Sequence, residues 1–134
     1  MSKSIEVRDY MRKPITVDQD LTVSEASQVI LKNKLSGVVV IDNDHHLVGM
    51  LSELDCLKAM VSAVYNGNAP GTEKVKHVMT TKVEVNHPQE DIITVAATML
   101  DHKHRRRPVT ENGKLVGQIT CRQLLRAISE FGDD

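Results

Sequence analysis

Aromatic residues are scarce in this chain of 134 residues, which contains one Phe, two Tyr and no Trp. Hydrophobic residues make up 40% of the total, so the core must be built mainly from aliphatic side chains. The scarcity of rings argues against a protein that binds single strands of nucleic acid by stacking bases on aromatic side chains. The length suits one compact domain or two small interlocked domains.

The sequence also lacks a strong net charge, a long apolar run and a cysteine pattern. Its formal net charge is −1, which gives no overall attraction toward nucleic acid or membrane surfaces. No apolar run approaches the length of about 18 residues that a membrane span needs, and the first residues do not have the pattern of a signal peptide. Cys56 and Cys121 fall at unmatched positions, which indicates free thiols. We therefore expect a soluble, cytoplasmic protein.

An internal repeat is the clearest pattern that is present. The stretch LVGMLSELD, which begins at Leu47, returns later as LVGQITCRQ. Ser52 is matched by Thr120, whereas Asp55 is matched by Gln123. We expect two tandem repeats that are not equivalent in function. Their expected bounds are 1–66 for the first repeat, 67–74 for a turn-rich connector and 75–131 for the second repeat.

Both repeats predict the same order of elements. For the first repeat we expect a helical turn at 7–11, a strand at 15–17, a helix after the capping box Thr22-x-x-Glu25, strands at 38–41 and before Ser52, and a helix at about 53–64. For the second we expect a turn at 75–79, a strand at 83–85, a helix capped by Asp91, a strand at 108–110, an Asn-Gly hairpin, and a helix at about 121–129 with Leu124, Leu125 and Ile128 inward. The fold class is therefore α/β, more closely α+β, with two β-α-β-β-α repeats that pack together about a pseudo-two-fold axis.

This arrangement resembles a pair of CBS domains, the tandem (Bateman) module named after cystathionine β-synthase. The motifs that carry the resemblance are VRDYM and VKHVM, ITV and VEV, GVVVID and RRPVTE, and LVGMLSELD and LVGQITCRQ. No single motif is specific, but the doubled set stands in a fixed order over nearly the whole chain. The resemblance implies a regulatory module, without catalysis of its own, that binds AMP, ADP, ATP, S-adenosylmethionine or a related adenosyl ligand in clefts between its repeats. It implies no required cofactor, and it implies an unidentified regulated partner protein.

The resemblance also implies which residues meet the ligand. In such modules a hydroxyl-x-x-Asp motif contacts the ribose, and Ser52 and Asp55 match it, whereas Gln123 departs from it. A carboxylate can accept both ribose hydroxyls, and a helix N-terminus favours phosphate. A plain helix cap explains the same motif without any ligand. The residues expected at the ligand are Thr16, Val17, Val38, Val39, Met50, Ser52, Asp55, Arg105, Arg106, Arg107, Pro108 and Thr120.

A basic run at 103–107 precedes the strand that begins at Pro108. The resemblance places this segment beside the nucleotide phosphates, for which guanidinium groups are well suited. Side chains alternate in direction along an extended segment, so Arg105 and Arg107 should share one face and Arg106 the other. A solvated cluster and an arm that binds nucleic acid remain as alternatives for this run.

Neither metal binding nor catalysis is expected. The six histidines have no Cys, Asp or Glu companion at a structural zinc spacing. No P-loop, nucleophile elbow or coherent triad is present, so we expect no enzyme. The apolar residues Leu57, Met60, Val61, Leu125 and Ile128 exceed what one sheet face needs, which predicts a homodimer. A ligand-free scaffold for dimerisation is therefore the competing hypothesis.

Overall fold

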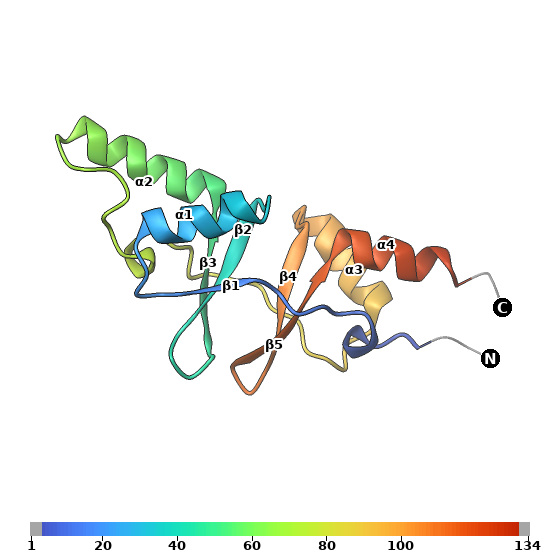
Figure 1. Ribbon diagram of the computed structural model, residues 1–134. Helices are drawn as coiled ribbons and strands as arrows, with labels where there is room; N and C mark the ends of the chain where they lie inside the picture. Colours follow the sequence, from blue (N-terminus) through green and yellow to red (C-terminus); the bar gives the residue numbers. More distant parts are fainter. Residues whose placement is uncertain (1–3, 132–134) are drawn as a thin grey trace. The chain divides into compact units, whose positions relative to one another are not determined.

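The computed structural model describes residues 4–131 (Figure 1), so the first three residues of the first expected repeat lie outside the described part. The residues form two compact units. The first unit comprises residues 15–83, and the second unit comprises residues 1–14 together with 84–134. The units therefore differ from contiguous sequence repeats, because each includes the helical turn that precedes the other repeat.

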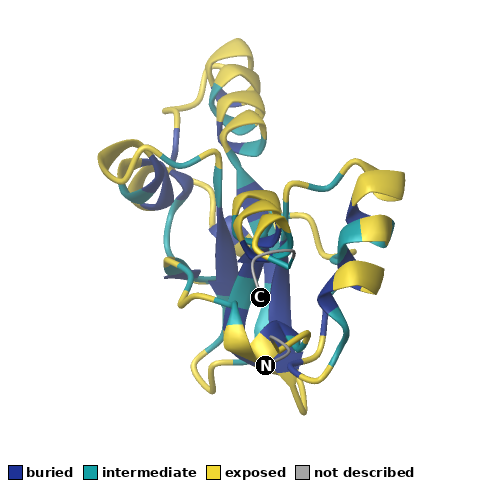
Figure 2. Ribbon diagram, turned by 90° about the vertical axis from the view of Figure 1, so that its right-hand side faces the viewer, coloured by how far each residue is buried: buried dark blue, intermediate teal, exposed yellow. Residues whose placement is uncertain are grey.

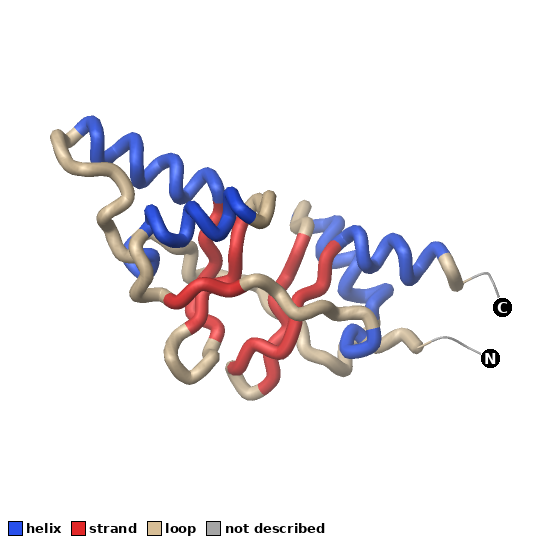
Figure 3. Tube along the Cα trace, in the orientation of Figure 1, coloured by secondary structure: helices blue, strands red, loops and turns tan. Residues whose placement is uncertain are grey.

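The first unit is a three-stranded sheet with two helices. Its elements are β1 (Thr16–Asp18), α1 (Val23–Lys32), β2 (Gly37–Ile41), β3 (Leu47–Ser52), α2 (Glu53–Tyr65) and the 3-10 helix η2 (Val75–His77). The strand order is β1-β2-β3, with β1 parallel to β2 and β2 antiparallel to β3. Figure 3 shows the helices and strands by colour in the orientation of Figure 1. This is the β-α-β-β-α order that the sequence predicts.

The second unit has a two-stranded sheet. Its elements are the 3-10 helix η1 (Val7–Asp9), α3 (Ile92–His102), β4 (Arg106–Glu111), β5 (Lys114–Thr120) and α4 (Cys121–Ser129). The strand expected at 83–85 is wrong, since only a single parallel bridge joins Asn86 to Val109. Asn86 donates to Pro108 O at 3.0 Å and accepts from Thr110 N–H at 2.9 Å. The ladder cannot extend toward residue 84 because Pro108 has no N–H to donate.

Local sequence signals place the helix starts and one hairpin as expected. Thr22 accepts the N–H of Glu25 at 3.1 Å while Glu25 accepts the N–H of Thr22 at 3.0 Å, which completes the capping box. Asp91 caps α3 by accepting the N–H of Ile93 at 2.6 Å. Asn112 and Gly113 have φ angles of 55° and 80°, as a type I′ turn requires.

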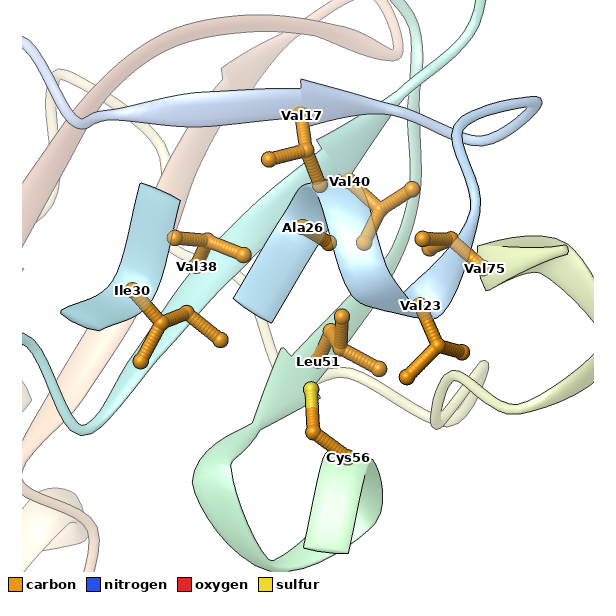
Figure 4. Close-up of a cluster of buried hydrophobic side chains, with 9 residues drawn as sticks. All are labelled: Val17, Val23, Ala26, Ile30, Val38, Val40, Leu51, Cys56 and Val75. Carbon is orange, nitrogen blue, oxygen red and sulfur yellow. The ribbon is translucent and has the colours of Figure 1, made fainter. Parts of the chain in front are cut away.

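Both helices of the first unit cover the same face of its sheet. Figure 4 shows the buried cluster in which α1, α2 and all three strands meet. Its members are Val17, Val23, Ala26, Ile30, Val38, Val40, Leu51, Cys56 and Val75. Val75 comes from η2, so the turn that opens the second repeat completes the core of the first unit.

The second unit is arranged in the equivalent way, because η1 inserts Val7 into its core. Val7 donates to Glu90 O at 2.9 Å, and Val75 donates to Leu21 O at 2.8 Å in the first unit. Each turn therefore adds backbone hydrogen bonds and one fully buried Val to the unit that it joins.

The helices carry many exposed residues (Figure 2). Several of these residues are large and apolar. Leu125 is 72% exposed, so its expected inward orientation is wrong, whereas Leu124 is 3% exposed and packs in the core. Consecutive residues on a helix point in directions about 100° apart, so both cannot face one core. Leu57 and Val61 on α2 are also exposed. Within residues 4–131, no helix is both long and apolar enough to cross a membrane.

Candidate ligand-binding site

Ser52 and Asp55 stand where β3 turns into α2, and they form a reciprocal capping box. Asp55 N–H donates to Ser52 Oγ at 3.0 Å, and Ser52 N–H donates to Asp55 Oδ2 at 3.0 Å. Both side chains are half-buried, which fixes the carboxylate at the helix N-terminus. Asp55 Oδ1 accepts no hydrogen bond from the described residues. The cap therefore uses one carboxylate oxygen and leaves the other as an open acceptor.

A cavity of about 280 Å³ borders Asp55 within the first unit. Lys58 and Ser62 of α2 line one side, and Glu73 and His77 from the segment around η2 line the other. The segment around η2, which opens the second repeat but packs in the first unit, thus supplies part of the cavity wall. Asp55 therefore borders a space lined by both acidic and basic side chains, and its carboxylate suits a ligand that carries hydrogen-bond donors.

The residues expected around the base divide between the two faces of the first sheet. Thr16 pairs with Val39, and Val39 pairs with Met50, so these three side chains share one face. Val17 and Val38 belong to the buried cluster on the opposite face (Figure 4). Only the backbone of Val17 and Val38 could reach a ligand on the face of Thr16, Val39 and Met50.

In the second unit, Thr120 and Gln123 repeat the capping geometry. Gln123 N–H donates to Thr120 Oγ1 at 3.2 Å, and Thr120 N–H donates to Gln123 Oε1 at 2.9 Å. A backbone N–H can only donate, so the amide oxygen must face Thr120 and the amide nitrogen must point away from it. Where Asp55 presents an acceptor, Gln123 therefore presents a donor.

Arg107 is internal, with only 3% of its surface exposed. Its Nε donates to His104 Nδ1 at 3.1 Å, and its Nη1 donates to Thr98 Oγ1 at 2.8 Å. Its Nη2 lies 3.2 Å from Glu84 Oε2 and 3.3 Å from His102 Nδ1. A buried charge needs such partners, and here each of the three guanidinium nitrogens has at least one.

The other residues of the basic segment are more accessible. Arg105 is exposed and Arg106 is half-buried, while Pro108 is fully buried in β4. Arg105 O accepts the N–H of Cys121 at 2.9 Å, which ties the segment to the start of α4 beside Thr120. Arg105 and Arg106 are thus the two arginines of the run that remain within reach of solvent.

The environment of Arg107 also gathers three residues that can bind metals, namely Glu84, His102 and His104. Their ligand atoms lie within 4.8 Å of one another. The Arg107 guanidinium already contacts all three side chains, so a divalent cation would lie against a fixed positive charge. The arrangement therefore serves to hold Arg107.

Sequence reasoning missed the residues that flank Asp55 in space. Glu73 lies at the end of the connector and His77 lies beyond it, and their place beside Asp55 depends on η2 joining the first unit. It likewise missed Glu84 as the partner of Arg107. The turns VRDYM and VKHVM can be recognised as a repeat, but their sequences do not indicate which unit each turn joins.

Known proteins with similar sequences match this chain over most of its length. A protein of Methanocaldococcus jannaschii, MJ1426, is 30% identical over 91% of this chain and 90% of its own length. The chain also matches parts of longer proteins, and it spans only 42% of another protein from the same organism.

Solved structures agree with the observed fold. The crystal structure of CBSX2 in complex with AMP matches with a TM-score of 0.81 and 26% identity, over 96% of this chain and 99% of that chain. The CBS-domain containing protein ATU1752 from Agrobacterium tumefaciens matches with a TM-score of 0.73 and 28% identity, over 92% of each chain. The CBS domain model matches twice, at residues 7–62 and 75–130, and the chain therefore belongs to the CBS domain family as a tandem pair.

Proposed function

We propose that this protein is a regulatory module that binds an adenine nucleotide or another adenosyl ligand, and that Asp55 holds the ribose. The observation that carries this proposal is the open Oδ1 of Asp55 beside a cavity, while Oδ2 completes the helix cap. Additional support comes from the structurally similar CBSX2, whose crystal structure is a complex with AMP. The ligand classes are AMP, ADP, ATP and S-adenosylmethionine.

The ribose is the part of the ligand that a carboxylate recognises best. Its two neighbouring hydroxyls are both donors, and a carboxylate is purely an acceptor at neutral pH. Each hydrogen bond to a charged acceptor contributes roughly 1.5–3 kcal/mol. The helix N-terminus that begins at Glu53 adds a positive dipole end, which favours a nearby phosphate.

Arg105 and Arg106 are the proposed phosphate contacts of the basic run. Arg105 is exposed and Arg106 is half-buried, whereas the Arg107 guanidinium contacts internal partners. Thr16 and Met50, which are half-buried on one sheet face, are the proposed contacts of the base, whereas Val39 on the same face is fully buried. The phosphate and base roles of these residues are part of the proposal.

Regulation would follow from binding alone. A ligand that prefers one conformation shifts the population toward it, and a partner protein that distinguishes the conformations responds to that shift. No catalytic step is needed, so the module requires no cofactor and acts through a regulated protein.

We also propose that the protein assembles as a homodimer through its exposed apolar helix faces. α3 and α4 border an almost wholly apolar cavity of about 420 Å³, which includes Leu100 and Leu125. Leu100 and Leu125 are 76% and 72% exposed, an unusual cost for a monomer in water. A second copy of the chain offers the same surface and could cover it by two-fold symmetry.

The test is calorimetric titration of AMP, ATP and S-adenosylmethionine into the wild-type chain and into Asp55→Asn and Gln123→Ala. Asn can still cap the helix, so Asp55→Asn should fold normally and weaken the adenosyl ligand about tenfold or more, about 1.4 kcal/mol. Gln123→Ala is the matched control in the second unit and should change this affinity much less. Melting temperatures of all three proteins control for stability.

Two outcomes would remove the proposal. If the wild type binds a ligand and Asp55→Asn binds it equally well, Ser52 and Asp55 form only a helix cap. If the wild type binds none of the three ligands, the ligand-free scaffold becomes the better reading. A parallel titration with a short RNA, repeated at rising salt, tests the nucleic-acid alternative.

A further inference from the structure

The second unit has a groove that differs in charge from the equivalent groove of the first unit. Its cavity of about 330 Å³ lies between α4 and the segment around η1. Arg122 and Arg126 of α4 line it together with Arg12, which follows η1. We call this cavity the arginine groove.

The three arginines are exposed, and none of their side chains forms a hydrogen bond or ion pair with the described residues. The position of Arg12 is nevertheless fixed, because it exchanges two backbone hydrogen bonds with Gln118 of β5, at 2.9 and 2.7 Å. Arginine side chains therefore line the cavity both from α4 and from a segment whose backbone is held by β5.

Acidic residues also border the arginine groove, but they do not neutralise it. Asp9 and Glu130 lie on its wall against three arginines, which leaves a net charge of 3 − 2 = +1. Asp9 already accepts a hydrogen bond from Ser4, and Glu130 has an interaction of its own. The positive charge is therefore less engaged than the negative charge.

The equivalent groove of the first unit has the opposite character. There Asp55 and Glu73 face a single Lys58, which gives 1 − 2 = −1 when His77 is neutral. Leu54 occupies the place of Arg122 in the repeat. The change from Asp55 to Gln123 is thus one of several changes that reverse the charge of the groove.

Gln123 adds a neutral donor to the same wall. Its Oε1 is held by the N–H of Thr120, and its Nε2 makes no hydrogen bond with residues 4–131. The N-terminus of α4 adds the positive end of the helix dipole. Every one of these groups donates hydrogen bonds or attracts negative charge, and none suits a ribose hydroxyl as Asp55 does.

We propose that the arginine groove binds the phosphate group of a small phosphorylated molecule. Two guanidinium groups can each offer a pair of N–H donors to phosphate oxygens, and the Gln123 amide can supply a further donor. The second unit is therefore a site of different specificity from the first, and Gln123 is part of its donor set. This inference concerns separate residues and stands whether or not Asp55 binds ribose.

The test is a titration of the isotopically labelled full chain with inorganic pyrophosphate, followed by the chemical shifts of backbone amides. At about 0.15 M salt, the Debye length of about 8 Å screens loose attraction to exposed charges. We expect saturable shifts at residues 10–12 and 121–126, and none at 54–58. Arg122→Leu, which installs the residue found at position 54, should weaken pyrophosphate about tenfold. Lys58→Met removes the basic residue of the first unit that corresponds to Arg126, and it should leave the pyrophosphate affinity unchanged.

Four results would overturn the proposal. Amide shifts that never saturate would mean that pyrophosphate is attracted to exposed charges without binding at a site. Shifts confined to 103–107 would assign the anion to the basic run. An Arg122→Leu protein that remains folded by circular dichroism and binds pyrophosphate with wild-type affinity would remove the groove from the interaction. Malonate serves as a dicarboxylate comparison, and its tighter binding would rule out phosphate as the preferred group.

Discussion

Gly117 of β5 lies so close to Met11 that a Cβ atom at position 117 would approach the Met11 sulfur to 2.6 Å. The same relationship holds in the first unit, where a Cβ atom at Gly49 would lie 2.7 Å from the sulfur of Met79. In both units a glycine of the Leu-Val-Gly triplet thus provides space for a methionine. That methionine follows the helical turn, η1 or η2, that comes from the other repeat. The repeated glycine has a steric reason that is independent of any ligand.

Gly117→Ala should therefore destabilise the protein by about 1–3 kcal/mol, because the added methyl group overpacks a close contact. Urea unfolding followed by circular dichroism measures the change. In the double variant Met11→Ala/Gly117→Ala the clash is gone, so the cost of the second alanine should fall. Additive effects of the two substitutions would contradict this explanation.

Glu84 balances the buried charge of Arg107, so its removal should weaken the fold. Glu84 is half-exposed, with 51% of its side chain accessible, which moderates the effect through solvent screening. We expect Glu84→Gln to cost roughly 1–3 kcal/mol in unfolding free energy. Glu73→Gln is the control, since Glu73 has no ion pair with the described residues. Equal stability of the two variants would mean that other partners suffice for Arg107.

The phosphate role of the basic run predicts a dependence on phosphate number. Replacing Arg105 and Arg106 by Gln should weaken ATP more than AMP, and it should leave adenosine unchanged, because only the phosphates lose partners. Arg107 is kept in this variant because its contacts are internal. Calorimetric affinities for the three ligands give the result. Unchanged affinities for all three would exclude both arginines from the ligand site.

Assembly can be tested at the apolar cavity of the second unit. Leu125→Arg places a charge in the proposed dimer surface and should shift the protein from a dimer to its 14.9 kDa monomer. Light scattering during size-exclusion chromatography at tens of micromolar reports the mass. Leu31→Arg is a suitable control because Leu31 is 65% exposed on α1 and outside the cavity. A wild-type chain that is already monomeric would refute the dimer.

The two thiols should differ in reactivity. Burial raises the pKa of the Cys56 thiol, whereas Cys121 is exposed. Because the folded pKa lies above the unfolded value, the stabilisation from the protonated thiol is complete below the unfolded thiol pKa, about 8.5, and is lost as the pH rises through the folded pKa. A thiol reagent at neutral pH should label Cys121 quickly and Cys56 only as the chain unfolds. Equal labelling rates would show that the first core opens readily.

Local physical chemistry made much of this fold predictable from sequence. The caps at Thr22, Ser52 and Asp91 depend on side-chain oxygens within a few residues of the N–H groups that they accept, so their patterns are visible in the letters. The Asn112-Gly113 turn follows from the φ angles that these residues tolerate. The repeat of LVG and the following hydroxyl likewise identified Ser52 and Asp55 as the most informative pair of the candidate site.

The sequence by itself determined the order of the elements apart from the strand expected at 83–85, the helix starts, and the difference between Asp55 and Gln123, because each depends on neighbours along the chain. Only the tertiary structure decided that each turn joins the other repeat's unit, that Glu84 meets Arg107, and that three arginines converge on one groove. It also decided against a strand at 83–85, where Pro108 on a separate strand lacks the necessary donor. These features depend on contacts between residues that are distant in sequence, and such contacts arise from packing and from the directions that strands and helices impose on their side chains.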